Sequence, residues 1–309
     1  MPIRYLDPRN DVVFKRIFGE HEAILRSFLN ALLPLPDDGQ IVSLEYLPAE
    51  QVPQLPLFKN TIVDVRCRDE KGRQFIVEMQ MNWTNAFLQR VLFNASKAYI
   101  RQLDRSERYE CLQPVIGLSI LDDVFRPETE QFYHHYQLAE ATEPESIIEG
   151  IKLVFIELPK FKASGLKRRL AVAWLRFLKE TGDVDTPEEQ AVLEQEVAAA
   201  APEIQEAVTL AMEAGFTPGQ LEAYDRYWDA VRTERTLFES GAEEARAKGH
   251  AEGRAEGRAE GRAEGRAEGR AEGLAEGLEE GRALERQTLK ARLIASGLSD
   301  EEANRLVGE

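Results

Sequence analysis

The sequence is poor in the residues that form covalent and zinc-based cross-links. Among its 309 residues are two cysteines, Cys67 and Cys111, and four histidines. Two cysteines give no disulfide framework, and neither residue type has the spacing of a zinc site. We therefore expect two reduced, mostly buried thiols in a cytoplasmic protein.

The sequence also lacks an apolar run of transmembrane length, and its first residues do not resemble a signal peptide, so we expect no membrane association. Positive charge is scarce too, since the formal net charge is −16. The acid is unevenly spread: residues 1–165 hold 19 Lys/Arg against 24 Asp/Glu, and residues 166–309 hold 20 against 31. Because local patches govern binding to DNA, the acidic total does not exclude a nucleic-acid partner.

The most informative segment is a predicted β-hairpin between Ile62 and Gln80. A three-residue loop, residues 70–72, would place Gly72 at the left-handed position that such a hairpin needs. The resulting register sets Asp64 directly opposite Glu78, with Cβ atoms roughly 5 Å apart on one face. A two-residue loop would put the two carboxylates on opposite faces.

Side-chain alternation also predicts the two faces of this hairpin. Val63, Val65 and Cys67 should share one face, and Asp64 and the two arginines that follow it should share the other. Two convergent carboxylates and one further polar group are what a divalent metal needs to hydrolyse a phosphodiester. The alternative is a solvated polar sheet face that carries two unrelated acids, and the hairpin alone leaves both interpretations open.

Apolar periodicity predicts the elements around the hairpin. A helix begins at Asn10 or Asp7-Pro8, carries an apolar stripe from Phe14 to Leu32, and ends before Pro34. A second helix, residues 84–103, begins at Thr84. Strands are predicted at residues 42–47, 114–121, 131–138 and 151–157, the last two as an extension of the sheet.

Basic residues recur along the second helix. The core face of this helix would hold Phe87, Leu88, Val91, Leu92, Ala95, Ala98, Tyr99 and Leu103. Arg90, Lys97, Arg101, Arg105 and Arg108 would lie near another face if the helix runs that far. This stripe is either a phosphate-contacting surface or a solvated basic face.

Residues 166–235 have helical patterns without recognisable chemistry, and a low-complexity tail follows. From Ala251 the chain repeats Ala-Glu-Gly-Arg. Each of these regularly spaced glycines costs a helix roughly 1 kcal/mol relative to alanine. The repeat is either a marginal helix that allows close helix–helix approach in an oligomer or a disordered spacer. We favour a long helix that ends at Gly297, followed by a short helix with a capping box from Ser299 to Glu302.

The order helix–strand–hairpin–helix–strand, together with Asp64 and Glu78-x-Gln80, resembles the PD-(D/E)XK nuclease superfamily. The run Asp11-Val-Val-Phe-Lys-Arg-Ile-Phe-Gly19 and the helix segment from Arg90 to Tyr99 are similar to its transposase-like branch, the recombination-promoting (Rpn) nucleases. The Gly/Glu/Arg-rich tail is also similar to that branch. Gln80 stands where the superfamily usually has a lysine.

This resemblance implies a Mg²⁺-dependent DNA endonuclease, a hydrolase that promotes DNA recombination, with Mn²⁺ as a substitute. It implies that Asp64 and Glu78 bind the metal and that Gln80 takes the lysine's catalytic position. We add the main-chain carbonyl of Met79 as a candidate metal ligand. Asp11, on the first helix, is either a further candidate ligand or an acid favoured by the dipole at the helix N-terminus. The candidate DNA-binding residues are Arg90, Lys97, Tyr99 and Arg101.

The sequence therefore predicts an α/β protein with a restriction-endonuclease-like core, a mixed sheet flanked by helices, then a helical region and a long C-terminal helix. The expected division is a nuclease-like domain at residues 1–165, a helical region at 166–240, the repeat at 241–288 and a short helical segment at 289–309. The alternative function is a catalytically inactive DNA-binding or scaffold protein. Either protein could form homo-oligomers through its C-terminal repeat.

Overall fold

The computed structural model describes residues 3–51, 61–103, 108–163, 168–184 and 186–308. The chain divides into two compact units, residues 1–236 and 237–309. The first unit is an α/β domain, and the second is helical.

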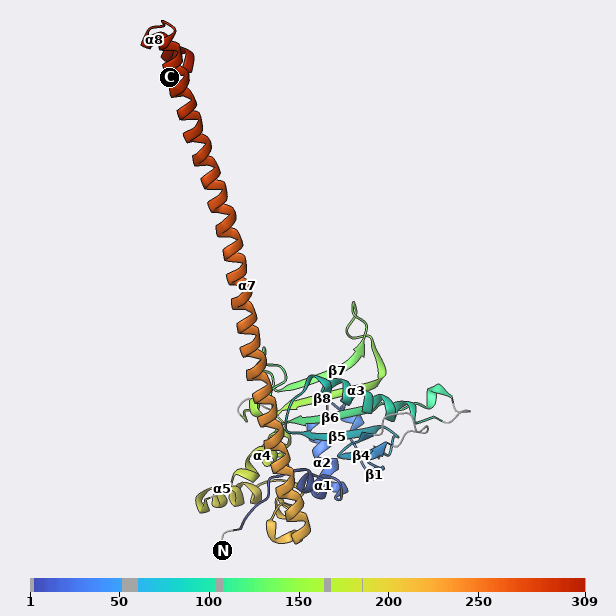
Figure 1. Ribbon diagram of the computed structural model, residues 1–309. Coiled ribbons are helices and arrows are strands. Elements are labelled where there is room, and N and C mark those ends of the chain that lie inside the picture. The colour runs from blue at the N-terminus through green and yellow to red at the C-terminus, as the bar shows by residue number, and fades with distance from the viewer. Residues whose placement is uncertain (1–2, 52–60, 104–107, 164–167, 185, 309) are drawn as a thin grey trace. The chain divides into compact units, whose positions relative to one another are not determined.

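A six-stranded mixed sheet forms the centre of the first unit, in the order β1-β4-β5-β6-β8-β7 (Figure 1). Its strands are β1 (Leu44–Tyr46), β4 (Val65–Asp69), β5 (Gln74–Gln80), β6 (Val115–Leu121), β7 (Tyr133–Ala139) and β8 (Ile147–Glu157). β5, β6 and β8 are parallel to one another, whereas β1, β4 and β7 join by antiparallel pairing. The two short strands β2 (Glu50–Gln51) and β3 (Thr61–Ile62) pair separately.

The described residues of the two units also form α-helices, and those of the first unit pack on both faces of the sheet. The helices are α1 (Asp11–Phe18), α2 (Glu22–Leu32), α3 (Asn85–Ile100), α4 (Arg169–Glu180), α5 (Pro187–Ala198), α6 (Pro202–Leu210), α7 (Pro218–Ala295) and α8 (Asp300–Val307). Single 3₁₀ turns lie at Asp37–Gly39, Tyr109–Cys111, Leu158–Lys160, Thr181–Asp183 and Glu213–Gly215.

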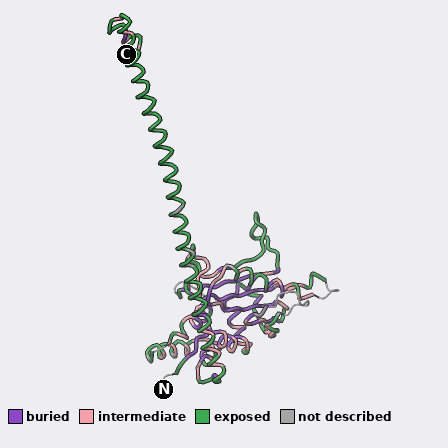
Figure 2. The backbone as a smooth tube through the Cα atoms, in the orientation of Figure 1, coloured by how far each residue is buried: buried purple, intermediate pink, exposed green. Residues whose placement is uncertain are grey.

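Two apolar clusters show which helix covers which face. The larger cluster joins α1, α2, α4 and α6 to Val65, Phe75 and Val77 of the sheet. The smaller cluster joins α3 to Ile76 and Phe155 on the opposite face. The central strands β5 and β6 are therefore buried on both sides (Figure 2), as the continuous apolar run of β6 requires.

The predicted N-terminal helix is broken into two. Asn10 caps α1 by accepting a hydrogen bond from the Val12 N–H, as one of the two predicted starts requires. α1 then ends at Gly19, whose N–H donates to the Lys15 carbonyl, and α2 begins three residues later. Because both short helices bury their apolar stripes in the same cluster, the stripe reads as continuous in the sequence although the helix is not.

Other sequence-based expectations for this unit are corrected at single residues. Cys111 is exposed, so only Cys67 is a buried thiol. α3 ends at Ile100 rather than residue 103, and Leu92 is 49% exposed instead of lying in its core face. Arg108 precedes a 3₁₀ turn and pairs with Glu110, while Arg105 lies outside the described residues.

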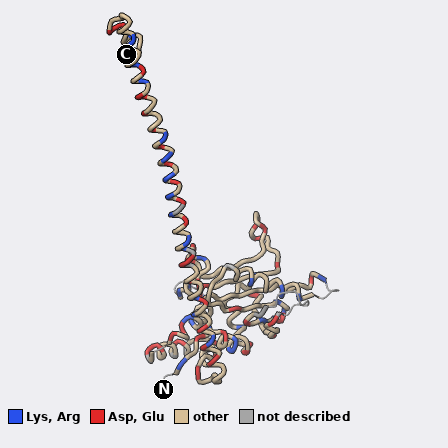
Figure 3. The backbone as a smooth tube through the Cα atoms, in the orientation of Figure 1, with Lys and Arg blue, Asp and Glu red and all other residues tan. Residues whose placement is uncertain are grey.

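The second unit contains the continuation of α7 through the repeat. The repeat is helical, and acidic and basic residues alternate along it (Figure 3). Gly297 has a φ of +102°, and Ser299 and Glu302 form the predicted capping box at the start of α8. The expected long C-terminal helix is confirmed. Among the described residues, no helix is both long enough and apolar enough to cross a bilayer.

Candidate active site

The β4–β5 hairpin has the predicted register from Val65 to Arg68, but the ladder does not extend to Asp64, so the predicted pairing of Asp64 with Glu78 is not part of it. Val65 pairs with Val77, and Arg68 pairs with Gln74. Gly72 has a φ of +85°, which L-residues with a side chain rarely adopt. Asp69 closes the loop, because its backbone N–H donates to the Arg73 carbonyl and its carboxylate lies 2.6 Å from the Arg73 guanidinium.

The chain bends at Asp64, and this bend changes the predicted faces. β4 begins one residue later, at Val65. Val65 and Cys67 pack in the larger cluster, but Val63 packs in the smaller cluster with Ile76, on the other side of the sheet. The prediction that Val63 shares a face with Val65 is therefore wrong, because strict alternation does not continue through a bend.

Because of the bend, the Asp64 side chain accepts a hydrogen bond from the backbone of β5 beyond the residues that β4 pairs with. The Met79 N–H donates to Asp64 Oδ2 at 2.7 Å, two residues beyond the last β4 pairing partner, Val77. In a strand the N–H and C=O of one residue point to the same side, so the Met79 carbonyl also faces the Asp64 side of β5. One carboxylate and one main-chain carbonyl are thereby brought together.

Glu78 lies under α3 rather than on a solvated sheet face. It is 7% exposed, and its Oε1 accepts a hydrogen bond of 2.9 Å from the side-chain amide of Asn94, which is 1% exposed. Its second oxygen, Oε2, is buried and has no hydrogen-bond partner among the described residues. Burial raises the pKa of Glu78, although Asn94 and the charge of Arg90 oppose this effect.

The Asp64 carboxyl lies among other acids. The pKa of Asp64 is raised to about 7, chiefly by burial. The hydrogen bond from the Met79 N–H and the charge of Lys15 oppose this rise, and the negative charges of Asp11 and Glu78 add to it. Asp11 is on the first turn of α1, where it forms an ion pair of 2.7 Å with Lys15. Asp11 therefore acts on Asp64 through its charge, and it is itself paired with a lysine.

These donors fit a hard divalent cation that keeps part of its water shell. No group of three or more His, Cys, Asp and Glu side chains could hold a metal ion in the described parts of the chain. Asp64 and Glu78 offer two carboxylates, and the buried Oε2 of Glu78 is an acceptor without a hydrogen-bond partner among the described residues. Mg²⁺ commonly takes one or two carboxylates and completes its octahedron with water and phosphate.

Gln80 is held at both ends of its side-chain amide. Its Oε1 accepts a hydrogen bond of 2.6 Å from Arg90 Nη2, and its Nε2 donates to the Asn82 carbonyl at 2.8 Å. Arg90 also lies over the Phe87 ring, 5.0 Å from its centroid. The structure therefore brings Gln80 and Arg90, two residues that the sequence placed in separate groups, into direct contact.

The other candidate DNA-binding residues of α3 lie elsewhere. Lys97 is 8% exposed, with its ammonium 5.6 Å from the Phe93 ring centroid, so it does not belong to a solvated face. Tyr99 packs against the smaller apolar cluster. Arg101 is the C-cap of α3, and its positive charge lowers the pKa of Arg66 after the larger effect of burial.

Sequence reasoning missed Asn94 and a cluster of charged residues beside the site, Arg9, Asp7 and Asp122. Asn94 follows Arg90 by one helical turn, which was the available signal. Arg9 contacts Asp7 at 2.7 Å and Asp122 at 3.1 Å, and the Asp122 N–H donates to the Gln80 carbonyl. No sequence motif connects Arg9 with Asp122, because these residues meet only when β6 ends beside β5.

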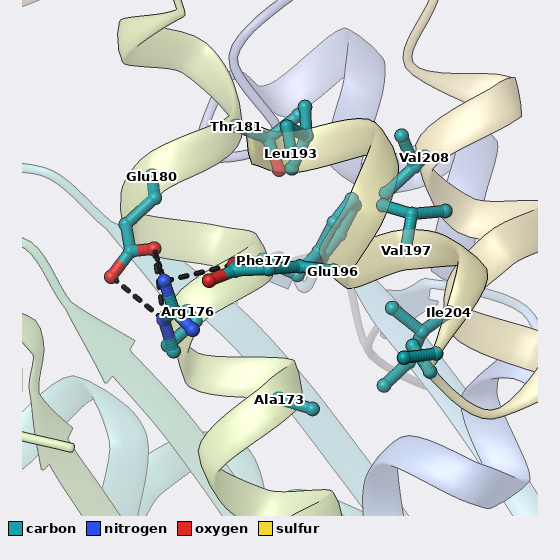
Figure 4. A pocket seen from close by; sticks show the side chains of 12 residues that line it. Ala173, Arg176, Phe177, Glu180, Thr181, Leu193, Glu196, Val197, Ile204 and Val208 are labelled. Atoms are coloured by element: carbon teal, nitrogen blue, oxygen red, sulfur yellow. Dashed lines mark hydrogen bonds and ion pairs between the residues drawn. The ribbon is translucent and has the colours of Figure 1, made fainter. Parts of the chain in front are cut away.

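An apolar pocket of about 290 Å³ lies in the helical part of the first unit, between α4, α5 and α6 (Figure 4). Phe177, Leu193 and Ile204 are among its lining residues. At its rim, Arg176 forms ion pairs with both Glu180 and Glu196. Its charged groups are thus paired with one another, and Asp64, Glu78 and Gln80 do not line it.

Comparison with known protein families gives one match. A family model described as PD-(D/E)XK nuclease family transposase matches residues 8–239, which include the hairpin, α3 and the start of α7. Neither a curated protein nor a solved structure matches the chain.

Proposed function

The chain belongs to the PD-(D/E)XK nuclease family transposases, and we propose that it is a metal-dependent DNA endonuclease that promotes recombination by hydrolysing phosphodiester bonds. Its family supports a nuclease-like function, and nucleases of this family generally use divalent metals. The observation that carries the proposal is the buried Oε2 of Glu78, which has no hydrogen-bond partner in the described part of the chain and lies on the same hairpin as the Asp64 carboxyl.

In this proposal Asp64, Glu78 and the Met79 carbonyl hold Mg²⁺, and Mn²⁺ can replace it. The bound ion would lower the pKa of a water molecule and stabilise charge on the phosphate oxygens. The protein's own contribution is to hold these oxygens in place. The Met79 N–H fixes Asp64 Oδ2, and the Asn94 amide fixes Glu78 Oε1.

Gln80 would contribute through the fixed orientation of its side-chain amide rather than through a charge. Its amide is fixed by Arg90 and the Asn82 carbonyl, so its orientation at the end of β5 costs little entropy when the substrate binds. Asp11 would act on the site through its charge, while Lys15 limits the local excess of negative charge. In this proposal α3 supports the two β5 side chains, and DNA is contacted through its exposed basic residue, Arg90.

A second candidate function is a catalytically silent DNA-binding or scaffold protein that assembles through its tail. The specific observation that favours it is Gln80, an uncharged residue in the position of the usual lysine. Binding of metal separates the two candidates, because a silent scaffold has no need of an occupied metal site.

The test is nicking of supercoiled plasmid DNA with Mg²⁺ or Mn²⁺, together with calorimetric titration of Mn²⁺. We expect the wild-type protein to nick and to bind Mn²⁺, and we expect Asp64→Ala and Glu78→Ala to lose both properties. Glu45→Gln is the matched control, because Glu45 is an exposed acid on the same sheet that pairs with Arg68. Full activity of Asp64→Ala would refute this site, and absence of Mn²⁺ binding by the wild-type protein would favour the scaffold.

A further inference from the structure

α3 packs along β5, and successive polar residues of the helix and the strand contact each other in pairs. Arg90 contacts Gln80, and Asn94, one helical turn later, contacts Glu78, two residues earlier in β5. A helical turn rises about 5.4 Å and two strand residues span about 6.7 Å, so the two repeats nearly match. α3 therefore runs antiparallel to β5 and presents one side chain to each of the two candidate catalytic residues of β5, Gln80 and Glu78.

Arg90 reaches the site with most of its binding capacity unused. A guanidinium has five N–H donors, and the hydrogen bond to Gln80 uses one of them. The Phe87 ring supports the guanidinium from below, and the residue as a whole is exposed. Arg90 forms no ion pair within 4.0 Å in the part of the chain that the structure describes, although its charge opposes, from a longer distance, the effect of burial that raises the pKa of the Glu78 carboxyl.

The neighbouring cations are occupied in other ways. Lys15 is paired with Asp11, and the Lys97 ammonium lies beside the Phe93 ring. Gln80 itself has no charge, and both ends of its amide are already hydrogen-bonded. The positive charge nearest to the position of the missing lysine is therefore that of Arg90.

We propose that Arg90 supplies, from α3, the positive charge that Gln80 cannot supply from β5. Gln80 orients the guanidinium through its Oε1, and the remaining N–H donors bind a non-bridging oxygen of the phosphate that is cleaved. A planar guanidinium suits this role because it binds phosphate in a bidentate manner and stays charged at every working pH. The proposal rests on the proposed nuclease function and adds a residue to its site.

The decisive experiment moves the charge from the helix back to the strand. The variants are Arg90→Gln, Arg90→Lys, Gln80→Lys and the double variant Gln80→Lys/Arg90→Gln. We expect Arg90→Gln to lower the single-turnover cleavage rate about 10²–10³-fold, the usual effect of removing one donor to a developing oxyanion. We expect the double variant to be at least tenfold faster than Arg90→Gln, because the lysine restores a cation beside the phosphate. Arg108→Gln, which removes an exposed arginine paired with Glu110, is the control.

A second readout does not depend on catalysis. Binding of a DNA duplex is measured with Ca²⁺ in place of Mg²⁺ over a series of salt concentrations. Loss of one phosphate contact should lower the slope of log Kd against log salt concentration by about one. A purely structural role for Arg90 would leave this slope unchanged. Circular dichroism and thermal melting identify any variant that fails to fold, and Arg90→Lys then provides the conservative comparison.

The outcomes separate this inference from the proposed function. Suppose that the wild-type protein cleaves DNA, that Arg90→Gln cleaves it equally fast, and that the salt slope is unchanged. Arg90 then has no such role, and the nuclease function still stands. A double variant no faster than Arg90→Gln would also overturn the charge-replacement proposal. If the wild-type protein neither cleaves DNA nor binds Mn²⁺, the proposed function fails and the role of Arg90 fails with it.

Discussion

The side-chain amide of Asn94 in α3 donates a hydrogen bond of 2.9 Å to Oε1 of Glu78 in β5, and both residues are buried. This hydrogen bond fixes one oxygen of the carboxylate and leaves Oε2 without a partner among the described residues. An outer residue that orients a ligand in this way is typical of metal sites, where it sets the direction of the ligand's lone pairs.

Asn94→Ala should therefore weaken the site without removing a ligand. We expect Mn²⁺ affinity and the cleavage rate to fall about 10–100-fold, the usual effect of losing a residue that supports a ligand. Calorimetric titration and single-turnover cleavage measure the two quantities. The control is Ser96→Ala, since Ser96 lies on the same helix and its hydroxyl bonds only the Leu92 carbonyl among the contacts found for it. Unchanged Mn²⁺ affinity in Asn94→Ala would contradict this role.

The crowding of Asp64 with Glu78 and Asp11 predicts a metal-dependent stability. Because burial raises the pKa of Asp64 to about 7, its charged form destabilises the metal-free fold above that pH. Asp64→Asn removes the charge, and its amide oxygen can still accept from Met79. We expect this variant, at pH 8 without metal, to be more stable than wild type by on the order of 1–2 kcal/mol.

Metal should reverse that order. Mn²⁺ at 100 times its dissociation constant should stabilise the wild-type protein by about 2.7 kcal/mol, but it should leave Asp64→Asn almost unchanged. Thermal melting at pH 8 with Mn²⁺ and with a chelator measures both effects. An equal metal-induced shift in both proteins would show that Asp64 is not a ligand.

The hairpin was predictable because one residue determines its register. Gly72 adopts a φ of +85°, which identifies the loop, and the loop length then fixes every pairing up to Val65. The bend at Asp64 was not predictable from alternation. It depends on the Asp64 carboxylate accepting the Met79 N–H, a contact between a side chain and a backbone group fifteen residues away.

The support given by α3 could be predicted only in part. Helical spacing placed Arg90 and Lys97 on one side of the helix, but which side meets the sheet depends on tertiary packing. The structure shows that the small residues Ala95 and Ala98 are buried, and this lets α3 approach the sheet closely enough for Asn94 to reach Glu78. A polar helix residue that supports a buried carboxylate has the same spacing as a solvated one, so the sequence leaves the two indistinguishable.

The helical repeat in the second unit is predicted to be stabilised by alanine. An added Cβ at Gly257, Gly261 or Gly265 would meet no atom within 4 Å, and each Gly→Ala change in a helix interior gains up to about 1 kcal/mol. We expect the triple variant to show stronger helical circular dichroism and a higher melting temperature for the repeat in the full-length protein.

The control for the repeat is Gly297→Ala, because Gly297 has a φ of +102° and alanine is strained there. This change should weaken the end of α7 rather than strengthen it. A triple variant with an unchanged helical signal would show that the repeat is not helical in solution.

Glu157 at the end of β8 is the centre of a buried ionic network. Its Oε2 contacts His134 Nε2 at 2.8 Å and Lys160 Nζ at 2.9 Å, and its Oε1 accepts from the N–H groups of Phe125 and Arg126. Burial by itself raises the pKa of Glu157, but the hydrogen bonds from Lys160, His134 and the backbone outweigh it and hold the pKa below its ordinary value. The charged form is thus favoured by the fold.

A depressed carboxyl pKa stabilises the fold above the unfolded-state pKa, about 4.3 for glutamate, and this stabilisation is lost as the pH falls through the folded-state value. Glu157→Gln should therefore cost about 3 kcal/mol or more at pH 7, because Lys160 and His134 lose their buried partner, and the difference from wild type should shrink below about pH 4. Urea denaturation at a series of pH values measures this. Glu128→Gln is the control, since Glu128 pairs with Arg126 at the surface and should change stability little. A cost for Glu157→Gln that stays constant from pH 7 to pH 3 would mean that the charge of Glu157 does not stabilise the fold.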